Sequence, residues 1–133
     1  KSHLARYYLR SLERTRRGDN QPELIVNDDQ TEITLEHILP ENPAGKWGRI
    51  DQSMAEPVYR RLGNMVLLRM SVNSVIGNVT FEEKKKAYEK SAQSLLLTQD
   101  VTTYPDWNLD MINLRQAELA KLAAKTWPIT PPR

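Results

Sequence analysis

The stretch EITLEHILP, residues 32–40, and the stretch LGNMVLLR, residues 62–69, decide the fold. Apolar and polar residues alternate in the first stretch, which predicts a half-buried strand over residues 32–38 that Pro40 ends. The second stretch is an apolar run, and it predicts another short strand over residues 64–69. We expect the two strands to pair as a small antiparallel hairpin.

The segment between the two strands has the composition of a long loop. It runs from Glu41 to about Pro57, is rich in Pro, Gly and Asn, and carries Trp47. One helical turn is expected near its end. A loop of this length within one domain is usually functional.

Helices are predicted on both sides of the hairpin in the sequence. Residues 3–16 place Leu4, Tyr8 and Leu12 on one apolar stripe, with Ala5 and Leu9 beside it, as in an amphipathic helix. A polar linker follows, up to about Thr31.

Two further helices follow the second strand. Thr80 and Glu83 have the spacing of a capping box, so a helix is expected to begin near Phe81. A last helix is predicted over roughly residues 109–126, where apolar residues recur on one face.

These elements predict an α+β fold that is mostly helical, with a hairpin-plus-helix core over residues 32–92. Additional helices at residues 1–17 and 108–127 are expected to surround it. A length of 133 residues suits a single domain. Because the chain begins within a helix and without a methionine, we expect it to be the C-terminal part of a longer protein.

Composition excludes several classes of protein and site. The chain has no cysteine, so disulfides, thiol nucleophiles and a cysteine-ligated structural zinc are not expected. No apolar run approaches the roughly 20 residues that span a bilayer, and no signal peptide is evident. We therefore expect a cytoplasmic protein without a membrane partner. A net charge of +2 is too small to indicate nucleic-acid binding by itself.

The polar residues next to the two strands carry the candidate chemistry. Glu36 and His37 end the first strand, Asn64 opens the second, and Asn73 follows it. An imidazole with a pKa of about 6.5 can accept a proton from water at neutral pH. Carboxylate and amide oxygens suit Mg²⁺ or Mn²⁺, which bind phosphate. The set is that of metal-assisted hydrolysis of a phosphodiester.

The motifs EHILP, LGNMVLL and NSVIGN, followed by spaced Phe, Lys and Tyr, carry a family resemblance. Together they resemble the C-terminal HNH-like domain of the GmrSD-type modification-dependent restriction enzymes. The resemblance runs over nearly the whole chain. It implies a ββα-metal (HNH, His-Me finger) core and metal-dependent cleavage of DNA, in bacterial defence against phage or other foreign DNA.

The resemblance also implies roles for individual residues. His37 falls on the general base, and Asn64 on the residue that braces the hairpin and orients the base. Glu36 and Asn73 fall on the ligands of a single Mg²⁺ or Mn²⁺ ion. Adjacent strand residues point to opposite faces, so Glu36 shares the site with His37 only if the strand bulges or ends there. Otherwise Asn78 is an alternative ligand.

Two lysines are candidates for contacts with the DNA backbone. Lys84 and Lys85 lie between Phe81 and Tyr88, two aromatic residues expected in the core. A lysine there can bury its stem and present its ammonium group to a phosphate at the edge. The resemblance further implies an N-terminal NTP-binding domain of the same protein that senses modified DNA.

Two other interpretations remain open from the sequence. One is a non-catalytic DNA-binding or protein-interaction module that kept the HNH-like fold. The presence of His37, Asn64 and Asn73 argues against it. The other is a purely helical partner-binding domain in which EHILP is a buried strand. Only the nuclease has a reason to bind a divalent metal beside His37.

Overall fold

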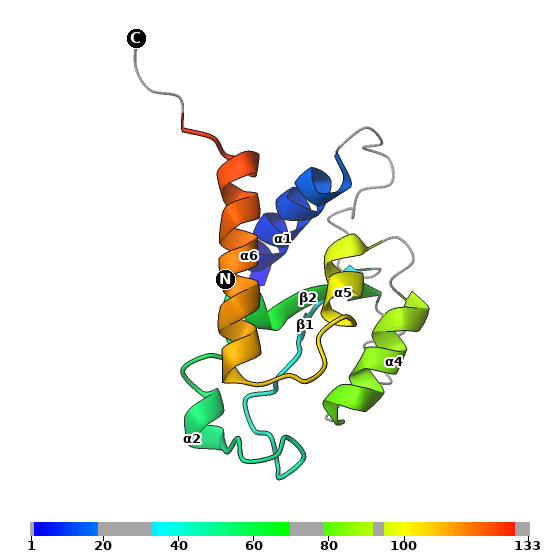
Figure 1. Cartoon of the computed structure of the whole chain (residues 1–133), viewed down its shortest axis with the longest axis vertical. Helices are drawn as coiled ribbons and strands as arrows, with labels where there is room; N and C mark the ends of the chain where they lie inside the picture. Colours follow the sequence, from blue (N-terminus) through cyan, green and yellow to red (C-terminus); the bar gives the residue numbers. More distant parts are fainter. Residues whose placement is uncertain (1, 19–32, 70–78, 92–94, 130–133) are drawn as a thin grey trace.

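The computed structural model describes residues 2–18, 33–69, 79–91 and 95–129. The elements in these ranges mix helices with one small sheet (Figure 1). In chain order they are α1 (Ser2–Arg17), β1 (Ile33–His37), α2 (Gln52–Ala55), the 3₁₀ turn η2 (Leu62–Asn64), β2 (Met65–Arg69), α4 (Phe81–Ser91), α5 (Leu96–Val101) and α6 (Leu109–Thr126). The mixed and mainly helical architecture agrees with the sequence-based expectation.

The predicted hairpin is confirmed. β1 pairs antiparallel with β2, and the register runs from Ile33 opposite Arg69 to His37 opposite Met65. Alternate residues of a strand point to opposite faces. His37 therefore lies on one face of the sheet and Glu36 on the other.

Both faces of this small sheet are covered, which departs from the expected half-buried strand. On the Glu36 face, Val66 and Leu68 pack with Tyr88 of α4. On the His37 face, Met65 and Leu67 pack in a cluster that includes residues of α1. Glu36 was expected on the polar face and is instead buried, because α4 covers that face.

The remaining helices form the outer part of the molecule (Figure 1). α6 contacts η2 and α1, and α1 also contacts α5 and both strands. α5 contacts β2 and α4. Helix α6 begins where the sequence predicted it, and the side chain of Asn108 caps it by accepting a hydrogen bond from the amide of Met111 at 3.0 Å. Within the described ranges, no helix is long and apolar enough to cross a membrane.

Helix α4 begins at Phe81, as the capping box predicted. The Thr80 hydroxyl accepts a hydrogen bond from the Glu83 amide at 3.3 Å. The Glu83 carboxylate in turn accepts a hydrogen bond from the Thr80 hydroxyl at 3.0 Å. The helical turn expected late in the long loop is α2, which Asp51 caps through the amide of Met54.

Helix α1 has the predicted length, but its buried face differs from the predicted stripe. Leu4 and Tyr8 are 45% and 38% exposed, while Leu9, Leu12 and two charged residues are buried. The buried Arg6 donates a hydrogen bond from Nη2 to the carbonyl of Ile33 at 3.0 Å. A stripe of apolar residues could not predict this face, because buried polar contacts form part of it.

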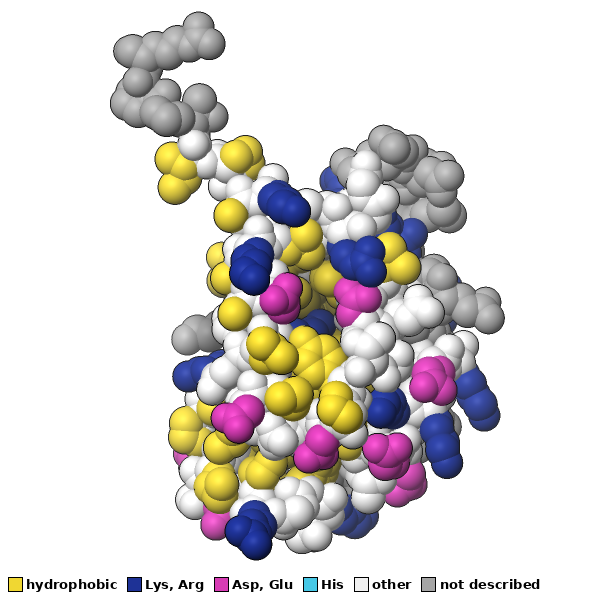
Figure 2. Space-filling view, viewed as in Figure 1, with side chains coloured by type: hydrophobic (Ala, Val, Ile, Leu, Met, Phe, Trp, Pro, Cys, Tyr) yellow, Lys and Arg dark blue, Asp and Glu magenta, His cyan; other side chains and the backbone are white. Residues whose placement is uncertain are grey.

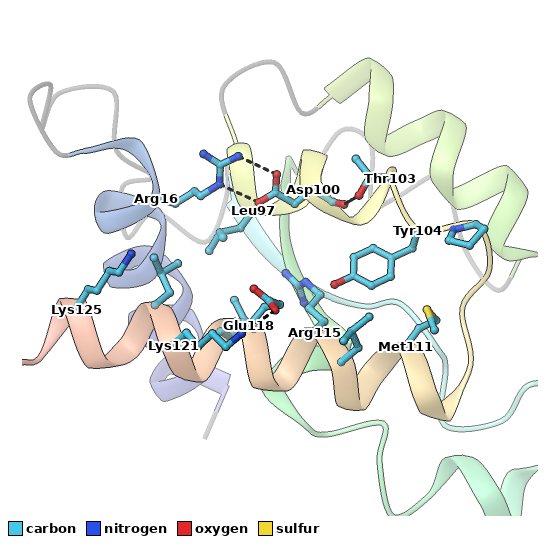
Figure 3. A pocket seen from close by; sticks show the side chains of 14 residues that line it. Arg16, Leu97, Asp100, Thr103, Tyr104, Met111, Arg115, Glu118, Lys121 and Lys125 are labelled. Atoms are coloured by element: carbon cyan, nitrogen blue, oxygen red, sulfur yellow. Dashed lines mark hydrogen bonds and ion pairs between the residues drawn. The ribbon is translucent and has the colours of Figure 1, made fainter.

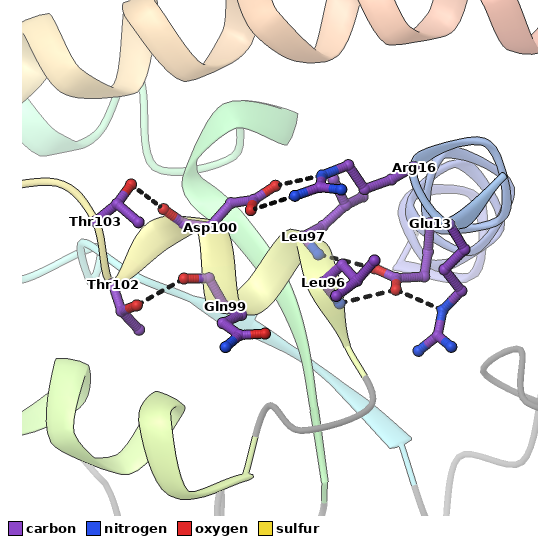
Figure 4. A network of polar contacts seen from close by, with 9 residues as sticks. Glu13, Arg16, Leu96, Leu97, Gln99, Asp100, Thr102 and Thr103 are labelled. Carbon is purple, nitrogen blue, oxygen red and sulfur yellow. Dashed lines mark hydrogen bonds and ion pairs between the residues drawn. The ribbon is translucent and has the colours of Figure 1, made fainter.

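Helix α5 was not predicted, and its N-terminus shows why. Leu95 precedes it without a side-chain cap. The Glu13 carboxylate of α1 instead accepts hydrogen bonds from the amides of Leu96 and Leu97, at 2.8 and 2.9 Å, and pairs with Arg17 at 2.7 Å (Figure 4). The cap lies more than 80 residues away in the sequence, so no local motif announces the helix.

Candidate active site around His37

His37 is the last residue of β1, and its half-buried ring packs against Tyr59 with 5.4 Å between the ring centroids. Tyr59 belongs to the segment between α2 and η2. Its hydroxyl accepts a hydrogen bond from Nε of Arg60 at 2.7 Å, and the Arg60 guanidinium lies 5.2 Å from the centroid of the Tyr59 ring. The imidazole thus sits beside an aromatic ring and an arginine.

The surroundings of His37 favour its neutral form. Burial lowers the pKa of the imidazole below 6.5, and the positive charges of Lys84 and Arg60 lower it further. Glu41 raises this pKa and offsets part of the effect. A neutral imidazole at pH 7 can accept a proton, which is what a general base has to do.

Lys84 connects α4 to the end of β1. Its Nζ atom donates hydrogen bonds to Glu36 Oε1 at 2.7 Å, to the His37 carbonyl at 2.9 Å and to the Ile38 carbonyl at 2.8 Å. Burial lowers the pKa of Lys84, and the neighbouring Glu36 carboxylate partly restores it. The two bonds to main-chain carbonyls fix the backbone at His37 and Ile38, and the third joins Lys84 to the Glu36 side chain.

The burial of Lys84 corrects one expectation. Its side chain is 3% exposed and its ammonium group already has three oxygen partners. The sequence predicted that Lys84 presents its charge to DNA. In this structure its ammonium group instead faces the protein interior. Lys85 is half-buried, with Nζ 5.4 Å from the centroid of the Phe81 ring. It remains the candidate on α4 for a phosphate contact.

The side chains of Glu36 and His37 do not meet, although Lys84 bonds the Glu36 carboxylate and the His37 carbonyl. The Glu36 carboxylate is buried against Lys84 and, at 3.4 Å, the Tyr88 hydroxyl. Burial is the main cause that raises the pKa of Tyr88 well above 10, followed by the charge of Glu36. The alternation of side chains along β1 therefore keeps the carboxylate and the imidazole on different faces.

Asn64 fastens the chain that follows His37. Its Nδ2 donates hydrogen bonds to the carbonyls of Leu39 and Tyr59, at 2.8 and 2.9 Å. Its Oδ1 accepts from the Leu39 amide at 2.8 Å and from Nε1 of Trp107 at 3.0 Å. Asn64 is fully buried. It therefore joins the residues that follow β1 to the turn that carries Tyr59.

Helix α6 holds the turn that carries Asn64. A Cβ atom on Gly63 would lie 2.6 Å from the carbonyl oxygen of Ile112, so only glycine permits this approach. Arg115 donates from Nη1 to the carbonyls of Gly63 and Met65, at 2.9 and 2.7 Å. The partners of this Nη1 atom are therefore main-chain carbonyls rather than a carboxylate.

The described residues contain few candidate ligands for a divalent metal. They contain no group of three or more His, Asp or Glu side chains that could hold one. The ammonium group of Lys84, 2.7 Å from Glu36, also competes with a cation for that carboxylate. Asn73 and Asn78, the other expected ligands, lie outside the described residues.

Two residues near His37 were missed from the sequence. Tyr59 and Arg60 follow a stretch without clear periodicity, and nothing local distinguished them from other loop residues. Their position next to His37 arises because Asn64 and α6 fix the turn behind them.

Comparisons with known proteins identify one family. The sequence model described as "GmrSD restriction endonucleases, C-terminal domain" matches residues 1–122. No curated protein and no solved structure matches the chain.

Proposed function

Because the chain belongs to the family of GmrSD restriction endonuclease C-terminal domains, we propose that it cleaves DNA with His37 as the general base. The observation that carries this proposal is the state of the imidazole. His37 is half-buried, its pKa is lowered by burial and by two cations, and its backbone carbonyl accepts a hydrogen bond from Lys84. These are the properties of a positioned proton acceptor.

In the proposed reaction, His37 removes a proton from a water molecule. The water oxygen forms a bond to the DNA phosphorus as the bond from phosphorus to the leaving sugar oxygen breaks. A proton from solvent reaches that oxygen, which leaves as a hydroxyl group, and His37 then releases its own proton to solvent. Arg60 places positive charge beside His37, and Lys85 lies on α4, so both favour the approach of the phosphodiester.

We further propose Mg²⁺ or Mn²⁺ as the cofactor, with Glu36 and Asn73 as ligands and Asn78 as the alternative to Glu36. The described residues contain no group of three or more His, Asp or Glu side chains, so the proposed site relies on Glu36 and on asparagines outside the described residues. Binding through Glu36 requires Lys84 to share the carboxylate. The proposed transfer of a proton from water to His37 does not itself involve the metal.

The family also supports a wider proposal for the whole protein. The hairpin followed by α4 has the element order of a ββα-metal core. DNA would be the substrate, and an N-terminal NTP-binding domain would sense modified DNA and license cleavage. The setting would be the bacterial cytoplasm and the defence against phage.

One observation favours a second candidate function. Glu36, the expected acidic metal ligand, forms an ion pair with Lys84. Such a pair stabilises the fold without requiring catalytic activity. The alternative is therefore a non-catalytic DNA-binding or protein-interaction module with the same fold.

Plasmid cleavage separates the two functions. Supercoiled DNA is incubated with the protein and Mg²⁺, Mn²⁺ or EDTA, and DNA binding is measured in parallel by anisotropy. For the nuclease, we expect metal-dependent nicking that His37→Ala and Asn73→Ala lower by about 10²-fold or more. His3→Ala, at the exposed second histidine, is the matched control and should leave the rate unchanged. Binding without cleavage in every metal would support the non-catalytic module.

A further inference from the structure

A cavity of about 710 Å³ lies on the side of α6 that faces α5. It shares no lining residue with the surroundings of His37, and its volume is in the range of pockets that take small molecules. Figure 2 shows this face, where apolar side chains fill a hollow that cationic and acidic side chains surround. The apolar part of the lining consists of Leu97, Pro105, Met111, Leu114, Leu119 and Leu122.

Arg115 forms the buried end of this cavity. It is 3% exposed, and its Nη1 atom is bonded to main-chain carbonyls. Its Nη2 atom has no hydrogen-bond partner among the described residues, which also place no carboxylate within ion-pair distance of it. The charge of Asp100 acts on Arg115 only from beyond ion-pair distance. A buried guanidinium that no carboxylate contacts directly is unfavourable, so the site favours an anion.

Tyr104 stands next to Arg115 in the cavity, with its hydroxyl directed toward the guanidinium (Figure 3). Burial raises the pKa of this hydroxyl, so it stays protonated at neutral pH and can donate a hydrogen bond. The cavity therefore offers a hydroxyl donor beside a cation.

The charges around the cavity leave a positive excess. Its lining holds four cations and two carboxylates. Asp100 forms a two-bond pair with Arg16, at 3.0 Å for each bond, and Glu118 contacts Lys121 at 3.4 Å (Figure 3). Arg115 and Lys125 remain without a carboxylate partner among the residues that the structure describes.

From this geometry we propose that the cavity binds a small organic anion, a carboxylate or phosphate monoester with an apolar group. The anionic end lies toward Arg115 and Tyr104, and the apolar group packs against the leucines and Met111. Lys125 adds attraction at the mouth. This proposal does not depend on DNA cleavage. Arg115 is used in both regions, because it also holds the turn before β2.

Calorimetric titration with a matched pair of probes tests the proposal. Benzoate and benzamide have nearly the same shape and differ in charge, and phenyl phosphate separates phosphate from carboxylate recognition. We expect saturable binding of benzoate or phenyl phosphate, and binding of benzamide weaker by about tenfold or more, since an ionic hydrogen bond is lost. Equal affinity for benzoate and benzamide, or no saturable binding of any probe, would overturn the proposal.

Variants locate the binding to this cavity. Leu114→Trp, at a half-exposed lining position, should block the site and abolish binding. Tyr104→Phe should weaken benzoate binding by about threefold or more, as expected for the loss of one polar contact. Lys86→Gln on α4, outside the lining, is the matched control and should bind as the unmodified protein does. Since Arg115 also holds the turn before β2, its substitution is not used. Binding that survives Leu114→Trp would place the anion elsewhere and contradict the proposal.

Discussion

At the scale of single residues, Lys84 and Arg60 set the state of His37 from two sides. Lys84 is buried beneath the strand, and Arg60 lies on the exposed turn beside Tyr59. Both lower the pKa of the imidazole, while Glu41 raises it. The protonation of the proposed base can therefore be changed in either direction by single substitutions.

The pH dependence of cleavage tests this arrangement. A general base must be deprotonated, so the rate should fall as the pH drops through the His37 pKa, which lies below 6.5. Arg60→Gln removes a positive charge and should move this fall to higher pH. Glu41→Gln removes a negative charge and should move it to lower pH. Cleavage rates measured from pH 4.5 to 8 provide the check, and shifts of the same sign in both variants would contradict the role of His37.

The Glu36–Lys84 pair is predicted to stabilise the fold only as a pair. Lys84→Met leaves a buried carboxylate without its partner and should lower the free energy of unfolding by about 3 kcal/mol. The double variant Glu36→Gln/Lys84→Met should recover part of this loss, because no charge is then left buried. Urea unfolding measures both. The single variant Glu36→Gln completes the comparison. If the double variant loses the sum of the Lys84→Met and Glu36→Gln effects, the two side chains act independently.

At the scale of elements, helix α5 depends on a residue of another helix. Glu13 accepts hydrogen bonds from two amides at the start of α5, and it is 2% exposed. Helix α5 in turn bonds to β2 through the hydroxyl of Thr98, which donates to the Leu67 carbonyl at 2.7 Å. The contact between α1 and α5 thus reaches the central strand.

Glu13→Ala is therefore expected to loosen α5. The buried Leu97 amide and the part-buried Leu96 amide lose their acceptor, so stability should fall by about 2–4 kcal/mol. Hydrogen exchange of the Leu96 and Leu97 amides should accelerate more than that of β2. The matched control is Glu118→Ala, which removes an exposed pair with Lys121 and should change stability by less than about 0.5 kcal/mol. Unchanged exchange in α5 would refute the capping role.

At the scale of the whole molecule, α1 closes the hydrophobic core from one side. Leu9 packs with the strands, and Leu12 packs with Leu97 of α5 and Leu119 of α6. Helix α1 therefore joins four elements that are far apart in the sequence, namely β1, β2, α5 and α6. Its loss should weaken the entire fold rather than one end of it.

Two leucines of α1 test this arrangement. Leu12→Ala leaves a cavity at a fully buried position and should lower the free energy of unfolding by about 2–5 kcal/mol. Leu4→Ala, at a position 45% exposed, should change it by less than about 0.5 kcal/mol. Circular dichroism and tryptophan fluorescence should report the same midpoint in each variant. Equal losses for the two variants would show that the predicted stripe, with Leu4 inside, was right.

The sequence by itself determined most of the local elements, α5 excepted, and the place of His37 at the end of a strand. Alternation predicted β1, the capping box predicted the start of α4, and the periodicity predicted α6, because each of these signals lies within a few residues. A bracing role for Asn64 came from the family resemblance and not from the local pattern. The structure gives its partners as Leu39, Tyr59 and Trp107. The roles of Asn73 and Asn78 stay predictions, as both lie outside the described residues.

Only the tertiary structure decided which polar side chains are buried and which partners they have. The burial of Lys84 and Glu36 depends on α4 covering one face of the sheet, and the start of α5 depends on Glu13 of α1. The close approach of Gly63 to α6 and the bond from Arg115 to the Gly63 carbonyl likewise join distant segments. The same packing leaves Nη2 of Arg115 without a hydrogen-bond partner among the described residues. A local pattern carries no information on such pairs, because the energy of a buried polar group depends on the partner that folding brings to it.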